Sequence, residues 1–202
     1  MAAEVSLKPR DSKRETASEV EALGGRLKGA RLAAHLTLDQ LAARSGVSRA
    51  MLSKVERGEK SPTLSIISRI ARGLDLSLSA LLGAEPDPAK IVVIPRSKRL
   101  VYKDPETGFE RHLLSPTHVD NGVELLMHVI PPGSSSGELP TYTTRTEKYL
   151  AVHQGALVLL VGEARYQLAA GDALYFEVRS NYRLLNEGDE PCIYYMVIVR
   201  QR

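Results

Sequence analysis

Cationic and hydroxyl side chains gather between Ser48 and Arg57, with no carboxylate between Ser48 and Val55. Arg49, Ser53 and Lys54 share one face of a helix at this spacing. Guanidinium, ammonium and hydroxyl groups supply the donors and the positive charge that DNA phosphates and base edges accept in the major groove. The spacing therefore predicts a helix with a face that suits nucleic acid.

Two short helices joined by a glycine turn must position this face. Thr37 can cap the first helix, in which Leu38 and Leu41 share an apolar face. Gly46 ends that helix, because glycine adopts positive φ at little cost. Ser48 then caps the second helix.

Apolar residues repeat at helical spacing on both sides of this pair, over residues 20–34 and 64–74, and leucines at 78, 81 and 82 close a bundle of about five helices. Residues 41–48 and 52–58, Leu-Ala-Ala-Arg-Ser-Gly-Val-Ser and Leu-Ser-Lys-Val-Glu-Arg-Gly, resemble the signature of the phage-repressor (XRE) helix-turn-helix family. The resemblance covers residues 19–83. It implies that the first helix crosses the DNA backbone and that the second enters the major groove.

Carried over by position, this resemblance gives eight candidate DNA-binding residues: Thr37, Leu38, Ser48, Arg49, Ala50, Ser53, Lys54 and Arg57. Arg49 is the best candidate for a bidentate contact to guanine, and the helix start at Leu38 would lie near a phosphate. The family often has Gln where this chain has Leu38 and Ala50, so base preference cannot be copied from relatives. The family also commonly pairs an arginine and a glutamate at the positions of Arg31 and Glu56.

Length and charge favour two domains of different character. Residues 1–83 contain 14 Lys and Arg against 9 Asp and Glu, whereas residues 84–202 contain 13 against 15. Only the first part suits a polyanion. We expect residues 1–18 to be a disordered arm and not a signal peptide, residues 84–90 to be a linker, and residues 91–202 to form the second domain. The single cysteine, Cys192, excludes an intrachain disulfide, and the absence of any long apolar run predicts a cytoplasmic protein without a membrane span.

The second domain has apolar runs of strand length separated by turn residues. The runs cover residues 91–94, 100–102, 123–130, 149–152, 156–161, 173–176 and 193–199. Many short strands of this kind predict an all-β sandwich or barrel. The fold class is thus α + β multidomain, with an all-α bundle followed by an all-β domain.

Two segments sharpen that assignment. Residues 132–138, Pro-Gly-Ser-Ser-Ser-Gly-Glu, with Glu147 and Gly155, resemble the first motif of the cupin family. Residues 168–176, Leu-Ala-Ala-Gly-Asp-Ala-Leu-Tyr-Phe, with Asn186, resemble the second. The resemblance covers about residues 91–200 and implies a jelly-roll barrel.

The chain departs from the metal-binding pattern of enzymatic cupins. By analogy, the metal-ligand glutamate and the second-motif histidine fall on Lys148 and Tyr182. An ammonium repels a cation, and the five histidines, at 35, 112, 118, 128 and 153, have no ligand spacing. We therefore predict no metal, no cofactor and no enzymatic activity.

A metal-free barrel can still bind a small molecule at its mouth. The candidate effector residues are Tyr142, Thr144, Lys148, Tyr182 and Asn186, with Arg183 beside Asn186 at the rim. One charge and several hydroxyls would suit a carboxylate or another small anion. The alternative is a packed barrel in which Lys148 reaches solvent or pairs with a glutamate at 138 or 147.

Together these features predict a transcriptional regulator that binds double-stranded DNA. A homodimer would bind an inverted repeat, with its recognition helices about 34 Å apart, and the barrel would dimerise and sense a small metabolite. One alternative is a DNA-binding protein whose barrel only dimerises, and a weaker one is a metal-dependent cupin enzyme fused to a DNA-binding domain. RNA binding is disfavoured, because Trp is absent and the helical part has no aromatic residue to stack on bases.

Overall fold

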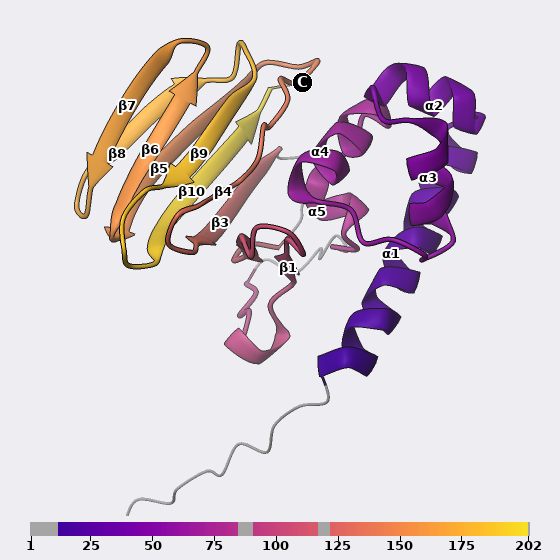
Figure 1. The fold of residues 1–202 in the computed structure, drawn as a ribbon, viewed down its shortest axis with the longest axis horizontal. Coiled ribbons are helices and arrows are strands. Elements are labelled where there is room, and N and C mark those ends of the chain that lie inside the picture. Colours follow the sequence, from indigo (N-terminus) through magenta and orange to yellow (C-terminus); the bar gives the residue numbers. More distant parts are fainter. Residues whose placement is uncertain (1–11, 85–90, 117–121, 202) are drawn as a thin grey trace, which may run out of the picture.

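A helical domain and a β domain lie side by side in the computed structural model, which describes residues 12–84, 91–116 and 122–201 (Figure 1). The helices are α1 Ser12–Ala33, α2 Leu38–Ser45, α3 Arg49–Glu56, α4 Leu64–Gly73 and α5 Leu78–Leu81. Residues 12–18, expected in the arm, begin α1, and that expectation is wrong for them. Residues 1–11 of the arm, 85–90 of the linker and His118 lie outside the described residues.

The helices are short and depend on their caps and on a shared core. The Thr37 side chain accepts a hydrogen bond from the Gln40 N–H, and the Gln40 side chain accepts one from the Thr37 N–H. Gly46 ends α2 with φ 67°, as predicted. Leu27, Leu41 and other apolar side chains of all five helices are buried in one core. Because helices of eight residues are marginal alone, this packing holds them in place.

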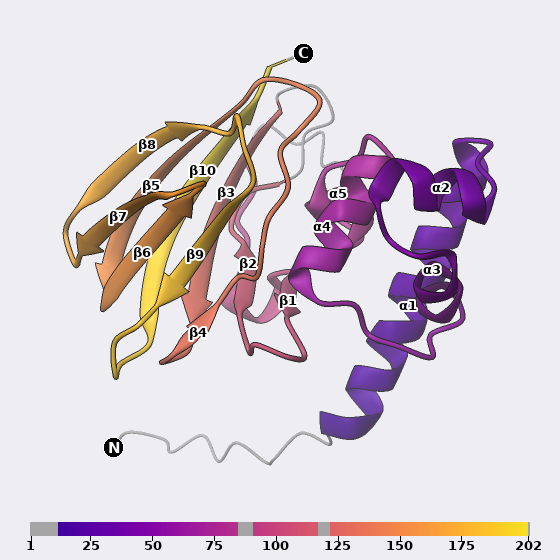
Figure 2. The ribbon, with the colours of Figure 1, turned by 45° about the horizontal axis from the view of Figure 1, so that its top comes forward.

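The β domain consists of ten strands after a short 3-10 turn, Arg96–Lys98. The strands are β1 Val101–Lys103, β2 Glu110–Leu113, β3 Val123–Ile130, β4 Ser134–Ser135, β5 Thr146–Gln154, β6 Ala156–Val161, β7 Ala164–Ala169, β8 Ala173–Glu177, β9 Tyr182–Asn186 and β10 Cys192–Arg200. They form two antiparallel sheets, in the orders β1-β2-β3-β10-β5-β8 and β4-β9-β6-β7. The sheets face each other around an apolar interior (Figure 2), which confirms the predicted barrel.

Several strands differ from those that the apolar runs predicted. Residues 91–94 form no strand, and Ile91 and Val93 are largely exposed, because no neighbouring strand pairs with them in the described chain. The prediction also missed β2, β4, β7 and β9. Most residues of β7 are exposed and β2 carries Arg111, so neither has the apolar run that was sought. No helix in residues 12–84, 91–116 or 122–201 is long and apolar enough to cross a membrane.

The close approach of α1 to α3 depends on Gly24. A Cβ atom added to Gly24 would lie 2.5 Å from the Val55 carbonyl oxygen, whereas one added to Gly25 would have nothing within 4 Å. Gly24→Ala should therefore destabilise the protein by about 1–3 kcal/mol. The control Gly25→Ala should stabilise it by about 0.5–1 kcal/mol, since alanine favours helix. Urea denaturation measures both changes, and equal effects would contradict the close packing.

Candidate nucleic-acid interface and barrel cavity

The face predicted to bind nucleic acid lies on α3, on the side of the helical domain away from the β domain (Figures 1 and 2). Ser48 caps α3 by accepting a hydrogen bond from the Met51 N–H. Leu52 and Val55 are buried beneath the helix, while Arg49, Ala50 and Lys54 are exposed. The structure thus gathers these three predicted residues on one solvent-facing surface.

The other predicted DNA-binding residues have additional contacts. The Arg57 guanidinium donates to the Ser53 hydroxyl and forms an ion pair with Glu59 at 2.5 Å. The Thr37 hydroxyl accepts the capping hydrogen bond of α2, and the Leu38 side chain packs partly against the core. The Thr37 N–H already donates to the Gln40 side chain, so the backbone N–H of Leu38 is the group of these two residues that can meet a phosphate.

Two carboxylates near this surface belong to residues outside the segment from Ser48 to Val55, and the sequence analysis did not include them. Asp39 on α2 lies 3.3 Å from the Arg49 guanidinium, and Glu59 pairs with Arg57. Both ion pairs are solvent-exposed, and such pairs contribute little to stability. Arg49 can therefore leave Asp39 for a stronger partner at small cost.

A buried ion pair fixes α3 against α1. The Arg31 guanidinium donates two hydrogen bonds to the Glu56 carboxylate, at 2.7 and 3.0 Å, and a third to the Leu36 carbonyl at 2.8 Å. The hydrogen bond to Glu56 raises the pKa of Arg31 further above its ordinary value. The predicted Arg31–Glu56 pair is confirmed, and its bidentate geometry fixes the orientation of the end of α3.

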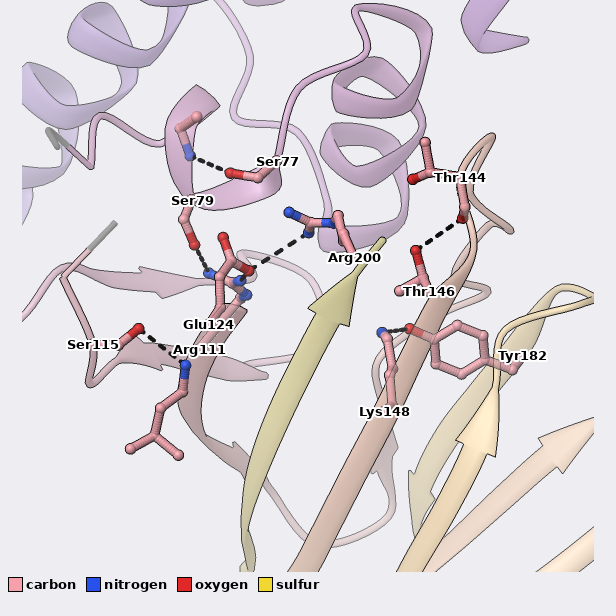
Figure 3. Close-up of polar contacts among 12 residues, drawn as sticks. Ser77, Ser79, Arg111, Ser115, Glu124, Thr144, Thr146, Lys148, Tyr182 and Arg200 are labelled. Atoms are coloured by element: carbon pink, nitrogen blue, oxygen red, sulfur yellow. Dashed lines mark hydrogen bonds and ion pairs between the residues drawn. The ribbon is translucent and has the colours of Figure 1, made fainter. Parts of the chain in front are cut away.

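A cavity of about 30 Å³ lies inside the β domain, where the helical domain covers it. The Lys148 side chain of β5 projects into it, is only 3% exposed, and donates a hydrogen bond to the Tyr182 hydroxyl of β9 (Figure 3). The ammonium also lies 5.5 Å from the ring centroid of Tyr142. Three of the five predicted effector residues thus meet around one cation.

The local charges make this lysine unusual. Burial lowers the pKa of Lys148. The nearby positive charges of Arg200 and Arg111 lower this pKa further, whereas Tyr142 acts to raise it. Glu138 and Glu147, the carboxylates of the packed-barrel alternative, have other partners: Glu138 accepts from Asn181 and Glu147 pairs with an arginine at 145. The structure contradicts the alternative in which Lys148 reaches solvent or pairs with them.

A second buried charge cluster lies beside Lys148, below α5 (Figure 3). Arg111 of β2 and Glu124 of β3 form an ion pair at 3.0 Å, and Arg200 of β10 lies 3.6 Å from Glu124. Arg111 also donates to the Ser79 hydroxyl at 2.9 Å. Burial acts to raise the pKa of Glu124, but Arg111 and Arg200 outweigh it and hold the pKa below its ordinary value.

The sequence interpretation missed this cluster and misjudged two effector residues. Glu124 and His128 occupy inward positions of β3, each two residues from the buried Leu126, and such a polar pair on a core face was the signal available. Thr144 and Asn186, which were predicted to bind an effector, do not line the cavity that contains Lys148. Thr144 is exposed outside the cavity. The buried Asn186 amide donates hydrogen bonds to the carbonyls of residues 130 and 190 and accepts one from the N–H of residue 188. Arg183 is also exposed and outside the cavity.

The cavity residues do not fit a metal ion. The residues at the two positions carried over from metal-binding cupins, Lys148 and Tyr182, bond to each other. Across the part of the chain that the structure describes, no group of three His, Cys, Asp or Glu side chains could hold a metal ion. Arginines at 111 and 200 add positive charge, which suits an anion better than a cation.

Comparison with known proteins agrees with this architecture. Family models described as "Helix-turn-helix" and "Cupin domain" match residues 27–81 and 126–198. The chain therefore contains a helix-turn-helix domain of the XRE type and a C-terminal cupin domain. Its helix-turn-helix domain supplies α2 and α3, and its cupin domain supplies both sheets.

Two curated relatives and one solved structure match most of this chain. The HTH-type transcriptional regulator SutR of Escherichia coli (strain K12) is 25% identical over 167 residues, which are 80% of this chain and 85% of SutR. The HTH-type transcriptional regulator PuuR of the same organism is 24% identical over 150 residues, 74% of this chain and 80% of PuuR. The crystal structure of an HTH_3 family transcriptional regulator from Vibrio cholerae has a TM-score of 0.78 at 24% identity, covering 93% of this chain and 99% of that one. This last likeness shows the same fold over both domains.

Proposed function

We propose that this helix-turn-helix transcriptional regulator binds an inverted-repeat operator as a homodimer in the cytoplasm and responds to a small anion held in its cupin cavity. It uses no metal and catalyses no reaction. The observation that carries the proposal is the pairing of an exposed cationic α3 with a cavity that the buried cations Lys148 and Arg111 line and that, among the described residues, no carboxylate lines.

The DNA contacts follow from the exposed surface of α3. Arg49, near the N-terminal end of α3, would donate two hydrogen bonds to guanine, and Lys54 would contact phosphate. The backbone at the start of α2 would meet a phosphate on the adjacent strand. The further proposed contacts are Ser48, Ala50, Ser53 and Arg57, with Leu38 acting through its backbone N–H and Thr37 through the cap that orients the start of α2.

Arg49→Ala should weaken operator binding about 5- to 150-fold and reduce discrimination against random DNA, because a base contact is lost. Lys54→Ala should weaken both DNAs equally and reduce the slope of log K against log salt by about 1. Fluorescence anisotropy across a salt series, on the gene's upstream duplex and a scrambled duplex, measures both. If Arg49→Ala binds the two duplexes as the parent does, Arg49 makes no base contact.

The dimer interface that we propose is the outer face of the six-stranded sheet. Cross-strand neighbours form two uncharged rows across β3, β10, β5 and β8: Leu125, Val197, Tyr149 and Tyr175 in one, and Met127, Tyr195, Ala151 and Ala173 in the other. Leu125, Tyr149, Tyr175 and Tyr195 are 38–49% exposed. A two-fold dimer places a surface against its own copy, so these two uncharged rows can pack together without self-repulsion, with Glu147 and Glu177 of the next row at their edge.

Tyr195→Arg should raise the dimer dissociation constant at least about tenfold, since it buries an unpaired charge. Tyr166→Arg is the matched control, because Tyr166 is 49% exposed on β7 of the other sheet. Sedimentation velocity compares the two. A parent protein that is monomeric at micromolar concentration, or equal effects of the two substitutions, would rule out this interface.

The effector proposal follows from the charge balance of the cavity. A buried ammonium whose nearest hydrogen-bond partner is a neutral phenol gains from an anion that can replace water. Tyr142 and Tyr182 add hydroxyls around it. The barrel that only dimerises remains the alternative, and it predicts no ligand at all.

Lys148→Met keeps the length of the side chain and removes its charge. In the parent, a carboxylate at 100 times its Kd should stabilise the folded state by about 2.7 kcal/mol, and Lys148→Met should abolish this gain while leaving operator affinity within about twofold. Thermal unfolding with acetate, glycolate or pyruvate measures it, with neutral acetamide as the ligand control. A full response in Lys148→Met would place the effector site elsewhere.

A further inference from the structure

The mouth of the cupin cavity is covered by the DNA-binding domain. Helices α4 and α5 lie between the barrel and the α2–α3 pair in both views (Figures 1 and 2). Leu64 and Ser68 of α4 and Leu78 of α5 line the cavity together with Lys148 and Arg111. The wall around the predicted anion is therefore built from two domains.

Polar contacts hold the two domains together around this cavity. The Asp104 carboxylate accepts a hydrogen bond of 2.5 Å from the Leu64 N–H at the start of α4. The Tyr102 hydroxyl donates to the Pro62 carbonyl, and the Ser65 hydroxyl donates to the Glu138 carbonyl at 2.6 Å. These contacts surround the cavity mouth, so the domains can separate there only by breaking several hydrogen bonds.

One polar side chain of the cavity has no partner in the described structure. Both ring nitrogens of His128 are buried without a hydrogen bond, and the ring packs against Phe109 at 5.1 Å and Tyr194 at 5.0 Å. Burial of an unsatisfied imidazole is costly, and a ligand with a hydrogen-bonding group would remove that cost. Burial, with Arg111 and Lys148 nearby, lowers the pKa of His128 well below its ordinary value and keeps the ring neutral.

We propose that the anion site is shared between the domains, so that a small carboxylate bound by Lys148 and Arg111, with His128 beside it, is enclosed by α4 and α5 and stabilises the docked arrangement. This inference rests on the effector site of the proposed function. It adds the residues Arg111 and His128, the walls supplied by α4 and α5, and the route by which ligand binding reaches the DNA-binding domain.

Cavity size limits the ligand. A volume of about 30 Å³ accommodates two or three water-sized groups, so a carboxylate as large as acetate, glycolate or pyruvate fits only when the side chains that line the cavity move apart. Tyr142 separates this cavity from an outer pocket of about 340 Å³ that Arg72 and Arg200 line. A ligand can enter from that side when Tyr142 moves.

Ligand binding can affect DNA binding because the ligand has different affinities for the docked and the separated arrangements of the domains. A ligand that touches α4 and α5 binds the docked arrangement more tightly than one in which the domains have separated, and it shifts the population accordingly. Arg111 contributes directly, because its guanidinium contacts both Glu124 of the barrel and Ser79 of α5. If the docked and the separated arrangements bind DNA with different affinities, the ligand changes the affinity of the protein for DNA by shifting the population between them.

A reversible crosslink tests this coupling in the full chain. A Cβ atom built on Gly137 would lie 3.3 Å from the Cβ of Ser65, close to the separation of about 3.5–4.5 Å found in disulfides. Ser65→Cys with Gly137→Cys should therefore lock the domains when oxidised. The reduced form of the same variant is the control, since it shares any strain at the positive φ of Gly137, and the native Cys192 is buried.

The carboxylate used is the one among acetate, glycolate and pyruvate that raises Tm most. The measured quantity is the affinity of the protein for the upstream duplex with and without this carboxylate. In the reduced protein the carboxylate should change DNA affinity at least about fivefold, and in the oxidised protein less than about twofold. Equal changes in the two forms, or binding without any change in DNA affinity, would overturn the shared site and leave the effector site intact. If no carboxylate raises Tm, the effector site itself fails.

A second variant tests the roof of the cavity without a crosslink. Ser68→Phe places a large side chain in the cavity from α4 and should abolish the carboxylate-induced rise in Tm, whereas Ser68→Ala should keep it. Both variants are checked for helix content by circular dichroism. An undiminished rise in a folded Ser68→Phe protein would show that α4 does not line the ligand site.

Discussion

Buried charge at the junction of the two domains sets the arrangement of the molecule. Arg111, Glu124 and Arg200 come from β2, β3 and β10, and all three lie at the barrel end below α5. An isolated charge in such a place is too costly to persist, so each must keep its partners. Because Arg111 also donates to Ser79, the requirement to pair these charges extends to the helical domain.

The two ends of the helical domain consequently serve different purposes. Helices α4 and α5 are held against the barrel by Asp104, Tyr102 and Arg111, while α3 faces solvent on the far side. The bidentate Arg31–Glu56 pair fixes α3 to α1 without involving the barrel. The helix that we propose to read DNA and the helices that contact the barrel are therefore held by separate sets of contacts in one small domain.

The cavity illustrates how one fold supports different chemistry. The barrel and its turns follow the cupin pattern, but Lys148 and Tyr182 occupy positions that metal ligands hold in cupin enzymes. An ammonium at such a position repels a cation and attracts an anion, which is the basis of the effector site that we propose. Substitutions at inward positions of β5 and β9 can change this charge without changing the sheets.

The sequence by itself determined the helix-turn-helix domain and the existence of the barrel. Thr37, Gly46 and Ser48 act through local backbone geometry, and the helical spacing of apolar residues marks the buried faces, so both can be recognised without distant contacts. Tertiary structure alone decided the cavity. Arg111, Glu124 and His128 lie on different strands or far from Lys148 along the chain, and only strand pairing brings them together. It also rejected Thr144 and Asn186, because hydrogen-bond partners and exposure depend on which backbone groups arrive nearby, and periodicity carries no information on that.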